Sequence, residues 1–304
     1  MNNLRHVLDR RQFSLTTLAA AASVAAPRVA AADGGAQPQR TYAAFIKFLQ
    51  PLGYDELADQ IAALGFQGVE ATVRTADGYI KPAEAAQELP KFQRALARRG
   101  LEITILTTDF LGVDQPHVES TLRAAADAGV GRYRLGFYRY DLGRPIEPQL
   151  DEIKPAIDAL AALNRRVGIG AVYQNHCGAD FVGATFWDLH RLLADVEPGE
   201  VGCVYDLRHA VVEAGEAWPM LYGLIKPHVT AASVKDFAWG DGKSQHVPLG
   251  EGRTPRKFYT DLAKSDFAGP ISLHVEYLKQ DHPVPEHLAA LKRDLATLRK
   301  WMDG

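Results

Sequence analysis

Several residue types are scarce in this sequence, and each scarcity excludes a class of protein. Only two of the 304 residues are cysteine, too few for the disulfide framework of a small secreted domain. The formal net charge of −3 gives no electrostatic reason to bind nucleic acid. No glycine-rich phosphate-binding motif follows the first expected strand, which disfavours a dinucleotide-binding sheet. The remaining composition, 47% hydrophobic and 23% charged, is typical of a globular protein.

The two cysteines, Cys177 and Cys203, are expected to be free thiols. A bridge between them stays open in an oxidising compartment, but small buried cysteines usually pack as apolar side chains.

The N-terminal segment has the composition of a targeting signal. Arg10 and Arg11 precede an alanine-rich apolar run that extends to about Ala26, and this arrangement resembles a twin-arginine export signal. We therefore predict a cleavable signal over residues 1–32 and a polar leader over 33–40, which would place the protein in the periplasm or outside the cell. A membrane anchor is less favoured because the run is short and alanine is barely apolar, so no stable membrane insertion is expected.

Residues 41–304 repeat one pattern, in which a β-rich run is followed by a polar loop and an amphipathic helix. The predicted strands are 41–48, 67–73, 101–107, 132–137, 167–173, 201–206, 228–235 and 269–276. The predicted helices are 54–64, 83–99 with a break near Pro90, 116–128, 147–165, 184–194, 216–225, 255–265 and 285–301. Glycines that follow helices, such as Gly65, Gly100 and Gly129, support these boundaries. Eight such units predict a single α/β domain, a (β/α)8 TIM barrel, with an open doubly wound sheet as the less favoured alternative.

A barrel of this kind places its active site at the C-terminal ends of the strands. Polar residues are concentrated at these predicted ends, whereas the N-terminal ends carry mostly small or apolar residues. The residues at or just after the strand ends are Lys47, Glu70, Arg74, Thr107, Asp109, Tyr138, Gln174, Asn175, His176, Asp206, His209, Lys235, Asp236, His274 and Glu276.

Asp206 and His209 can present a carboxylate and an imidazole to one cation across a turn. Together with Glu276 and Gln174 they form a plausible oxygen and nitrogen site for Mn, Mg or Zn. Capping of a helix or loop and ion pairing at the rim are the alternatives for the same residues.

Lys235 follows the seventh predicted strand. It can hold an anion, stabilise an enolate or, in a dry site, act as a base. The alternative is an ion pair with Asp206 or Glu276, which would compete with a metal. The long segment that follows, through Trp239 to Gly252, suits a lid or a substrate wall.

Six short motifs in the expected order resemble the sugar phosphate isomerase/epimerase superfamily, the xylose-isomerase-like or AP-endonuclease-like TIM barrels. They are Gly-Val-Glu (68–70), Gln-Asn-His (174–176), Asp-Leu-Arg-His (206–209), Val-Lys-Asp (234–236), Pro-Leu-Gly-Glu-Gly (248–252) and His-Val-Glu (274–276). The export signal suggests an exported branch of that superfamily.

The resemblance implies one divalent metal held at the ends of the fifth to eighth strands. Asp206 and Glu276 match the implied ligands, but Gln174 stands where a glutamate is expected and Ser233 where a histidine is expected. A site with fewer anionic ligands should bind metal more weakly.

The implied chemistry is proton transfer next to the carbonyl of an unphosphorylated sugar or keto sugar. The predicted catalytic residues are Glu276, Lys235, Glu70 and His176, and the predicted metal ligands are Asp206, Glu276, Gln174 and His209. The predicted substrate-binding residues are Lys47, Arg74, Tyr138, Asn175, His209, Trp239 and His274.

Two alternatives remain open, a keto-sugar lyase or hydratase and a non-catalytic sugar-binding subunit. DNA repair is disfavoured by the acidic balance of the chain, and a homo-oligomer is neither required nor excluded.

Overall fold

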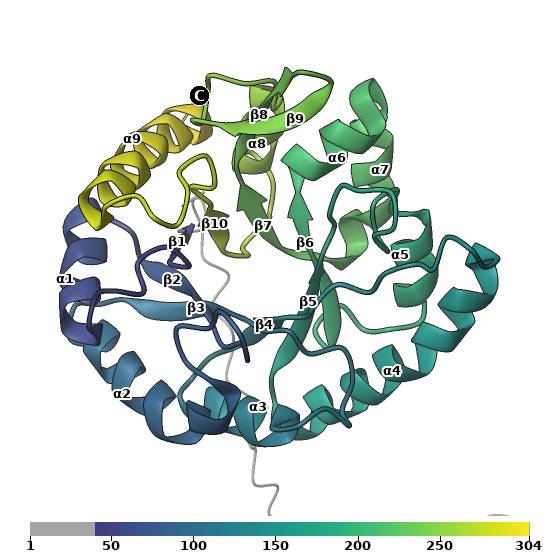
Figure 1. Ribbon diagram of the computed structural model, residues 1–304, viewed down its shortest axis with the longest axis horizontal. Coiled ribbons are helices and arrows are strands. Elements are labelled where there is room, and N and C mark those ends of the chain that lie inside the picture. Colours follow the sequence, from purple (N-terminus) through teal and green to yellow (C-terminus); the bar gives the residue numbers. More distant parts are fainter. Residues whose placement is uncertain (1–39, 304) are drawn as a thin grey trace, which may run out of the picture. The chain divides into compact units, whose positions relative to one another are not determined.

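The computed structural model describes residues 40–303, and within them eight parallel strands close into a barrel surrounded by helices (Figure 1). The barrel strands are β1 (Tyr42–Phe45), β2 (Gly68–Thr72), β3 (Glu102–Thr107), β4 (Arg132–Arg134), β5 (Gly170–Gln174), β6 (Val201–Asp206), β7 (Val229–Val234) and β10 (Ile271–Leu273). The helices are α1 (Tyr54–Leu64), α2 (Ala85–Ala97), α3 (Val118–Asp127), α4 (Ile146–Val167), α5 (Trp187–Leu193), α6 (Leu207–Ala214), α7 (Trp218–Ile225), α8 (Arg256–Ala263) and α9 (Val284–Met302). The predicted TIM barrel is confirmed.

The barrel closes because β10 pairs with both β1 and β7. The strands are buried on both faces, and their outward apolar side chains pack against the surrounding helices in one large core. Gly65, Gly100 and Gly129 follow helices with φ of 88°, 70° and 82°, a left-handed conformation that glycine adopts without strain.

The structure differs from the predicted elements in three places. Pro90 lies inside an unbroken α2, so the predicted break is wrong. Residues 207–214 form α6, which the prediction left as a loop because its start coincides with the charged strand end at Asp206. The predicted long loop after β7 is instead a hairpin of β8 (Asp236–Gly240) and β9 (Lys243–Val247).

The turn of this hairpin explains the difference. Asp241 and Gly242 both have positive φ, 50° and 73°, the backbone geometry of a tight two-residue hairpin turn. An Asp-Gly pair between two short runs is a hairpin signal in the sequence itself.

The predicted signal and leader fall almost entirely in residues 1–39, outside the described residues. Among residues 40–303, no helix combines the length and apolar character needed to cross a membrane. Cys177 and Cys203 are both free thiols, as predicted.

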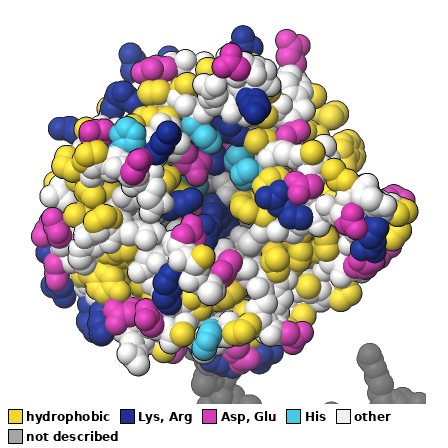
Figure 2. Space-filling view, viewed as in Figure 1, with side chains coloured by type: hydrophobic (Ala, Val, Ile, Leu, Met, Phe, Trp, Pro, Cys, Tyr) yellow, Lys and Arg dark blue, Asp and Glu magenta, His cyan; other side chains and the backbone are white. Residues whose placement is uncertain are grey.

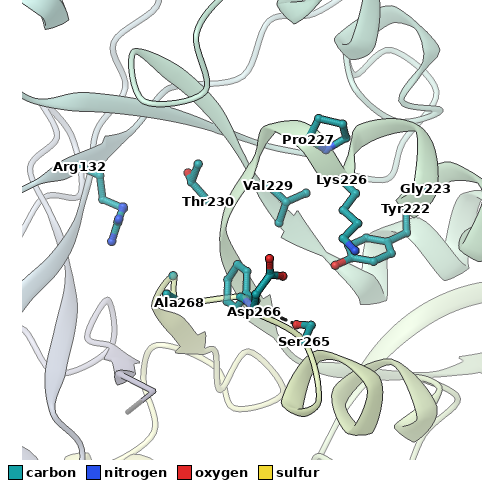
Figure 3. Close-up of a pocket in the computed structure, with 12 residues that line it drawn as sticks. Arg132, Tyr222, Gly223, Lys226, Pro227, Val229, Thr230, Ser265, Asp266 and Ala268 are labelled. Atoms are coloured by element: carbon teal, nitrogen blue, oxygen red, sulfur yellow. Dashed lines mark hydrogen bonds between the residues drawn. The ribbon is translucent and has the colours of Figure 1, made fainter. Parts of the chain in front are cut away.

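A cavity of about 620 Å³ lies at the N-terminal ends of the strands (Figure 3). Arg132 at the start of β4 and Val229 at the start of β7 line it, together with Lys226 and Asp266. It is therefore at the end of the barrel opposite the polar strand ends.

Candidate active site

The C-terminal strand ends bring seven polar side chains together in the barrel interior. We call this set the interior charge network: His274, Glu70, Arg134, Gln174, Asp206, Lys235 and Glu276. Figure 2 shows cationic, acidic and histidine side chains gathered in the hollow of the barrel.

Lys235 is the cation at one end of the network. Its Nζ lies 3.1 Å from Oδ2 of Asp206 and 2.8 Å from Oε2 of Glu276. Burial disfavours the charged ammonium, but the two carboxylates outweigh burial and raise the pKa of Lys235. Burial also opposes the charge of Glu276, yet Lys235 holds the pKa of that carboxyl well below its usual value. The raised pKa favours the charged ammonium form of Lys235 at neutral pH.

Glu70 is the anion at the other end of the network. Its Oε2 accepts hydrogen bonds from Ser272 at 2.6 Å and from His274 at 2.9 Å, and its Oε1 accepts one from Thr107. Burial would raise the pKa of Glu70, but His274 and Arg134 outweigh it and lower the pKa. Glu70 is fully buried, and both of its oxygens accept hydrogen bonds from neighbouring side chains.

Arg134 and Gln174 connect these two ends. Arg134 Nη1 lies 3.3 Å from Oε1 of Glu70 and donates a hydrogen bond to Oε1 of Gln174. Gln174 then donates its Nε2 to Oδ2 of Asp206 at 2.8 Å and to Oγ of Ser233 at 3.3 Å. Because a guanidinium only donates and a carboxylate only accepts, these partners fix the orientation of the amide. Gln174 presents an N–H, and not its oxygen, to Asp206.

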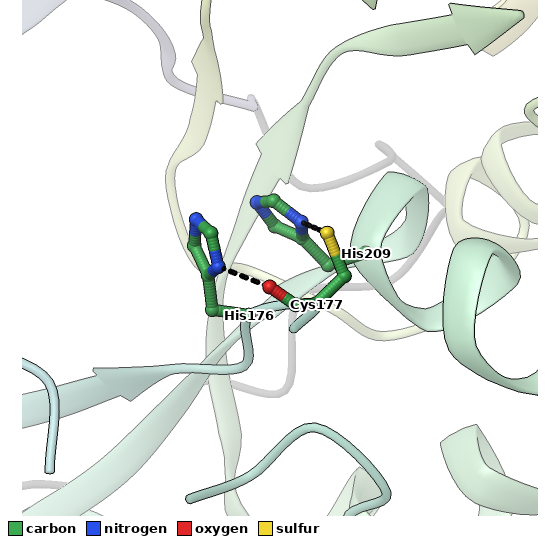
Figure 4. Close-up of side chains that lie close together, drawn as sticks. All are labelled: His176, Cys177 and His209. Carbon is green, nitrogen blue, oxygen red and sulfur yellow. Dashed lines mark hydrogen bonds between the residues drawn. The ribbon is translucent and has the colours of Figure 1, made fainter. Parts of the chain in front are cut away.

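Two histidines and a cysteine, His176, His209 and Cys177, lie close together (Figure 4), and His209 approaches Asp206. The rings of His176 and His209 are 3.9 Å apart, and the partners of each ring assign its neutral tautomer. Nδ1 of His176 contacts the Cys177 carbonyl at 2.8 Å, so this nitrogen carries the proton and Nε2 keeps a lone pair. Nδ1 of His209 accepts from Arg208 at 2.9 Å, so Nε2 carries the proton. That Nε2 is buried, has no hydrogen-bond partner and lies 3.6 Å from Oδ2 of Asp206.

The imidazoles near Lys235 are neutral at pH 7. Burial and the charge of Lys235 lower the pKa of His176 to about 4 and lower that of His209 well below 6.5. Burial also lowers the pKa of His246 to about 4, although Glu276 opposes the shift. His176 therefore offers a neutral, partly exposed ring whose Nε2 lone pair can accept a proton, and its lowered pKa makes it a weaker base than a free imidazole.

The β8–β9 hairpin brings His246 to the site. Nε2 of His246 lies 4.0 Å from Oε2 of Glu276, and Oγ of Ser244 accepts a hydrogen bond of 2.9 Å from Arg208. Trp239, predicted to bind substrate, is 49% exposed on β8 and packs edge-on against Phe237.

Asp236 fixes the base of the hairpin to the loop that follows. Its carboxylate accepts backbone N–H bonds of 3.0 Å from Gly250 and Gly252 and of 2.8 Å from Thr254. The loop 248–254 is therefore held by one side chain from the end of β7.

The structure places the remaining predicted substrate-binding residues in two groups. Lys47 and Arg74 lie near one carboxylate, Asp77, at 3.9 and 3.6 Å, and retain partial exposure. Asn175 and His274 are almost completely buried. Asn175 exchanges two hydrogen bonds with the backbone of Asp206, at 2.7 and 2.9 Å, so it positions that residue.

The side chain of Tyr138 is also held by contacts within the protein. Its hydroxyl donates to the Leu111 carbonyl and its ring stacks on Tyr173. The prediction that Tyr138 binds substrate depended on a fourth strand that runs to residue 137. The strand ends at Arg134, so the residue that enters the barrel interior is Arg134, which the prediction missed. Arg208 and His246 were also missed, and only the hairpin signal around Gly242 could have indicated the position of His246.

The model of a known protein family, described as xylose isomerase-like TIM barrel, matches residues 58–301. The chain belongs to this family. No curated protein matches the chain at a significant level. Solved structures that are similar to this chain cover almost the whole barrel. Their sequence identities to it are low, so they show a shared fold and not a shared reaction.

Three of these structures illustrate the range. A putative xylose isomerase from Rhodospirillum rubrum has 18% identity and a TM-score of 0.69, over 86% of this chain and 99% of that chain. The 3-keto-D-glucoside 4-epimerase from E. coli has 14% identity and a TM-score of 0.63, over 86% and 99%. A xylose isomerase-like protein from Mycobacterium smegmatis, solved in complex with magnesium, has 16% identity and a TM-score of 0.62, over 87% and 97%.

The predicted metal ligands lie together in this family member, but their atoms do not fit a divalent ion as they stand. Lys235 already pairs with Asp206 and Glu276, Gln174 turns an N–H toward Asp206, and the free nitrogen of His209 carries a proton. Elsewhere in residues 40–303, His176, Cys177 and His209 offer ligand atoms within 4.8 Å of one another. There Arg208 lies 2.8 Å from Sγ of Cys177 and 2.9 Å from Nδ1 of His209, so a cation is again in place.

Proposed function

We propose that this protein is a sugar isomerase or epimerase that moves a proton next to the carbonyl of an unphosphorylated sugar or keto sugar. The observation that carries the proposal is the ammonium of Lys235, held between Asp206 and Glu276 at the C-terminal end of the barrel, with the neutral imidazole of His176 at the same end. Such a pair can stabilise the negative oxygen of an enediolate and accept the proton taken from carbon.

Lys235 and His209 are the proposed oxygen-binding groups. An ammonium has three N–H donors, and the two carboxylates beside Lys235 take one each. The third N–H and the unpartnered Nε2–H of His209 are donors of the kind that stabilises a developing oxyanion. Burial strengthens both interactions because little water competes for these donors.

His176 and Glu276 are the proposed proton-transfer pair. Glu276 retains 22% exposure of its side chain, compared with 5% for Lys235 and 0% for Asp206. Of the two carboxylates paired with Lys235, it is therefore the one that a substrate can reach. One of the two groups takes the proton from one face of the sugar, and the other, after it has taken up a proton from water, returns a proton to the opposite face.

No step of the proposed reaction uses the predicted Mn, Mg or Zn ion, because the side-chain atoms of the predicted ligands do not fit a divalent ion in their present orientation. Export to the periplasm or beyond rests on the predicted signal over residues 1–32 and favours an unphosphorylated substrate, since free sugar phosphates are scarce outside the cytoplasm. The same enolate-forming groups would serve a keto-sugar lyase or hydratase.

Solvent deuterium exchange tests the proposal. The purified protein is incubated in D2O with a panel of aldoses, ketoses and 3-keto-glycosides, and deuterium incorporation at carbon is followed by NMR. We expect incorporation next to the carbonyl of at least one sugar, with loss of that signal in Glu276→Gln. Formation of an unsaturated product would favour the lyase. Binding of a sugar without any exchange would favour the non-catalytic sugar-binding subunit and overturn the proposal.

A further inference from the structure

We infer that the ammonium of Lys235 takes the place and the electrostatic role of a divalent cation in this barrel, so that the proposed reaction proceeds without a bound metal. The inference rests on the proposed function for its chemistry and on the arrangement of side chains for its geometry.

The first argument is the position of the ammonium. Lys235 Nζ lies within 3.1 Å of a carboxylate oxygen on β6 and within 2.8 Å of one that follows β10. A divalent ion bound to these same oxygens, at about 2.0–2.2 Å, would have to lie close to the ammonium in a site of low dielectric constant. Such repulsion between two cations is severe, so the site holds one or the other.

The second argument is the orientation of the neighbouring groups. Arg134 takes the oxygen of Gln174, and the amide nitrogen then faces Asp206 and Ser233. A metal needs a lone pair, and this amide offers a proton instead. The surroundings of Asp206 are therefore built to donate hydrogen bonds to a carboxylate.

The third argument is His209. Because Arg208 donates to its Nδ1, the proton of the neutral ring lies on Nε2, the atom that faces Asp206. A protonated nitrogen cannot bind a metal, whereas it can bind the oxygen of a substrate. The ring is 2% exposed and its Nε2 is unpartnered, which is the arrangement expected of a donor that awaits a polar ligand.

The fourth argument is the balance of charge. In the interior charge network, the carboxylates of Glu70, Asp206 and Glu276 face the side-chain cations Lys235 and Arg134, with His274 bonded to Glu70. With a neutral His274, these three carboxylates and two cations sum to a net charge of −1. A divalent cation added beside Lys235 would reverse the sign of this buried charge and would not neutralise it.

Metal titration of the full-length protein, purified without a histidine tag, tests the inference. Metal content is measured by mass spectrometry, and the thermal midpoint is recorded with EDTA and with added Mn²⁺, Mg²⁺ or Zn²⁺. We expect a substoichiometric metal content and no shift of the midpoint with chelator or metal. Near-stoichiometric metal that raises the midpoint, with both effects lost in Asp206→Asn, would overturn the inference.

A lysine variant supplies the complementary measurement. Lys235→Met frees the carboxylates of Asp206 and Glu276, two anionic ligands that suffice for weak metal binding without Gln174 or His209, and we expect the variant to gain a midpoint shift with Mn²⁺ that the wild type lacks. Lys257→Met, which removes an exposed lysine paired with Asp261, is the matched control and should gain none. A folded Lys235→Met protein that gains no metal response would also count against the inference. If this variant does not fold, the wild-type titration still decides.

The two proposals fail separately. A metal-free wild type that exchanges no sugar proton would refute the proposed function and leave the position of Lys235 intact. A wild type that exchanges protons only after metal is added would support the reaction and refute the role of Lys235.

Discussion

Arg134 donates a hydrogen bond to Gln174, and this contact joins the two ends of the interior charge network. On one side Arg134 lies 3.3 Å from Glu70, and on the other Gln174 donates to Asp206. The charge state of Glu70 and the orientation of the groups around Asp206 therefore depend on the same guanidinium.

Replacement of Arg134 is expected to be strongly destabilising. Arg134→Met leaves Glu70 buried with only part of its charge compensated, and loss of one partner of a buried ion pair typically costs about 3–5 kcal/mol. Urea denaturation measures the free energy of unfolding. Arg123→Met is the control because it breaks an exposed helical pair with Glu119, which solvent screens and which contributes little to stability. Similar losses in both variants would contradict the importance of the network.

Replacement of Glu276 is expected to reduce activity and also to lower stability, because it removes one of the two carboxylates that pair with the buried Lys235. Glu276→Gln keeps the shape of the side chain, and loss of a general acid–base group typically lowers the rate about 10²–10⁴-fold. The rate of deuterium exchange and the thermal midpoint are measured in parallel. Glu286→Gln changes an exposed carboxylate on α9 and should leave both unchanged. An unaltered exchange rate in Glu276→Gln would remove this residue from the reaction.

Stability is expected to fall in acid because His176 and His246 are half-buried as neutral rings. Their folded pKa values are about 4, below the ordinary value of 6.5, so between these values the unfolded chain binds more protons than the folded one. The free energy of unfolding should therefore decrease as the pH falls from about 6.5 to about 4.

Urea midpoints measured across this pH range test the linkage. His246→Asn should flatten the decrease, whereas His117→Asn, at an exposed histidine before α3, should not. An equal slope in wild type and His246→Asn would show that this ring does not contribute.

The hairpin is expected to loosen when its tie to α6 is removed. Ser244→Ala deletes the hydroxyl that accepts a hydrogen bond from Arg208, a contact that keeps β9 beside the site. Amide hydrogen exchange in residues 236–247 should become faster, and KM should rise more than kcat falls, because His246 is held less firmly. Ser120→Ala, at an exposed serine on α3, provides the control. Unchanged protection of the hairpin would contradict its dependence on this bond.

The sequence was sufficient to predict the barrel and the strand ends that face one another. Asp206, Lys235 and Glu276 follow different strands, but the closed parallel arrangement brings the ends of those strands together. The spacing of apolar residues and the glycines that end helices carry this information because both reflect local backbone geometry.

The pairing of charges could not be predicted in the same way. The sequence left open whether Glu276 faces a metal or Lys235, since either cation compensates the charge of a buried carboxylate. The choice depends on the Lys235 side chain reaching two strand ends at once, and on Gln174 being turned by Arg134. Those are long-range contacts, and Arg134 itself was hidden by a strand boundary misplaced by three residues, at 137 instead of 134.

The β8–β9 hairpin is a part of this barrel that can change in sequence without disturbing the barrel strands. Its first and last residues, Asp236 and Val247, are paired with each other, so the chain leaves and re-enters the barrel at nearly the same point. Changes at its tip, around Asp241 and Gly242, alter neither the register of a barrel strand nor the loop fixed by Asp236. The hairpin is thus an exchangeable module, through which evolution or design can alter substrate preference while the catalytic groups stay in place.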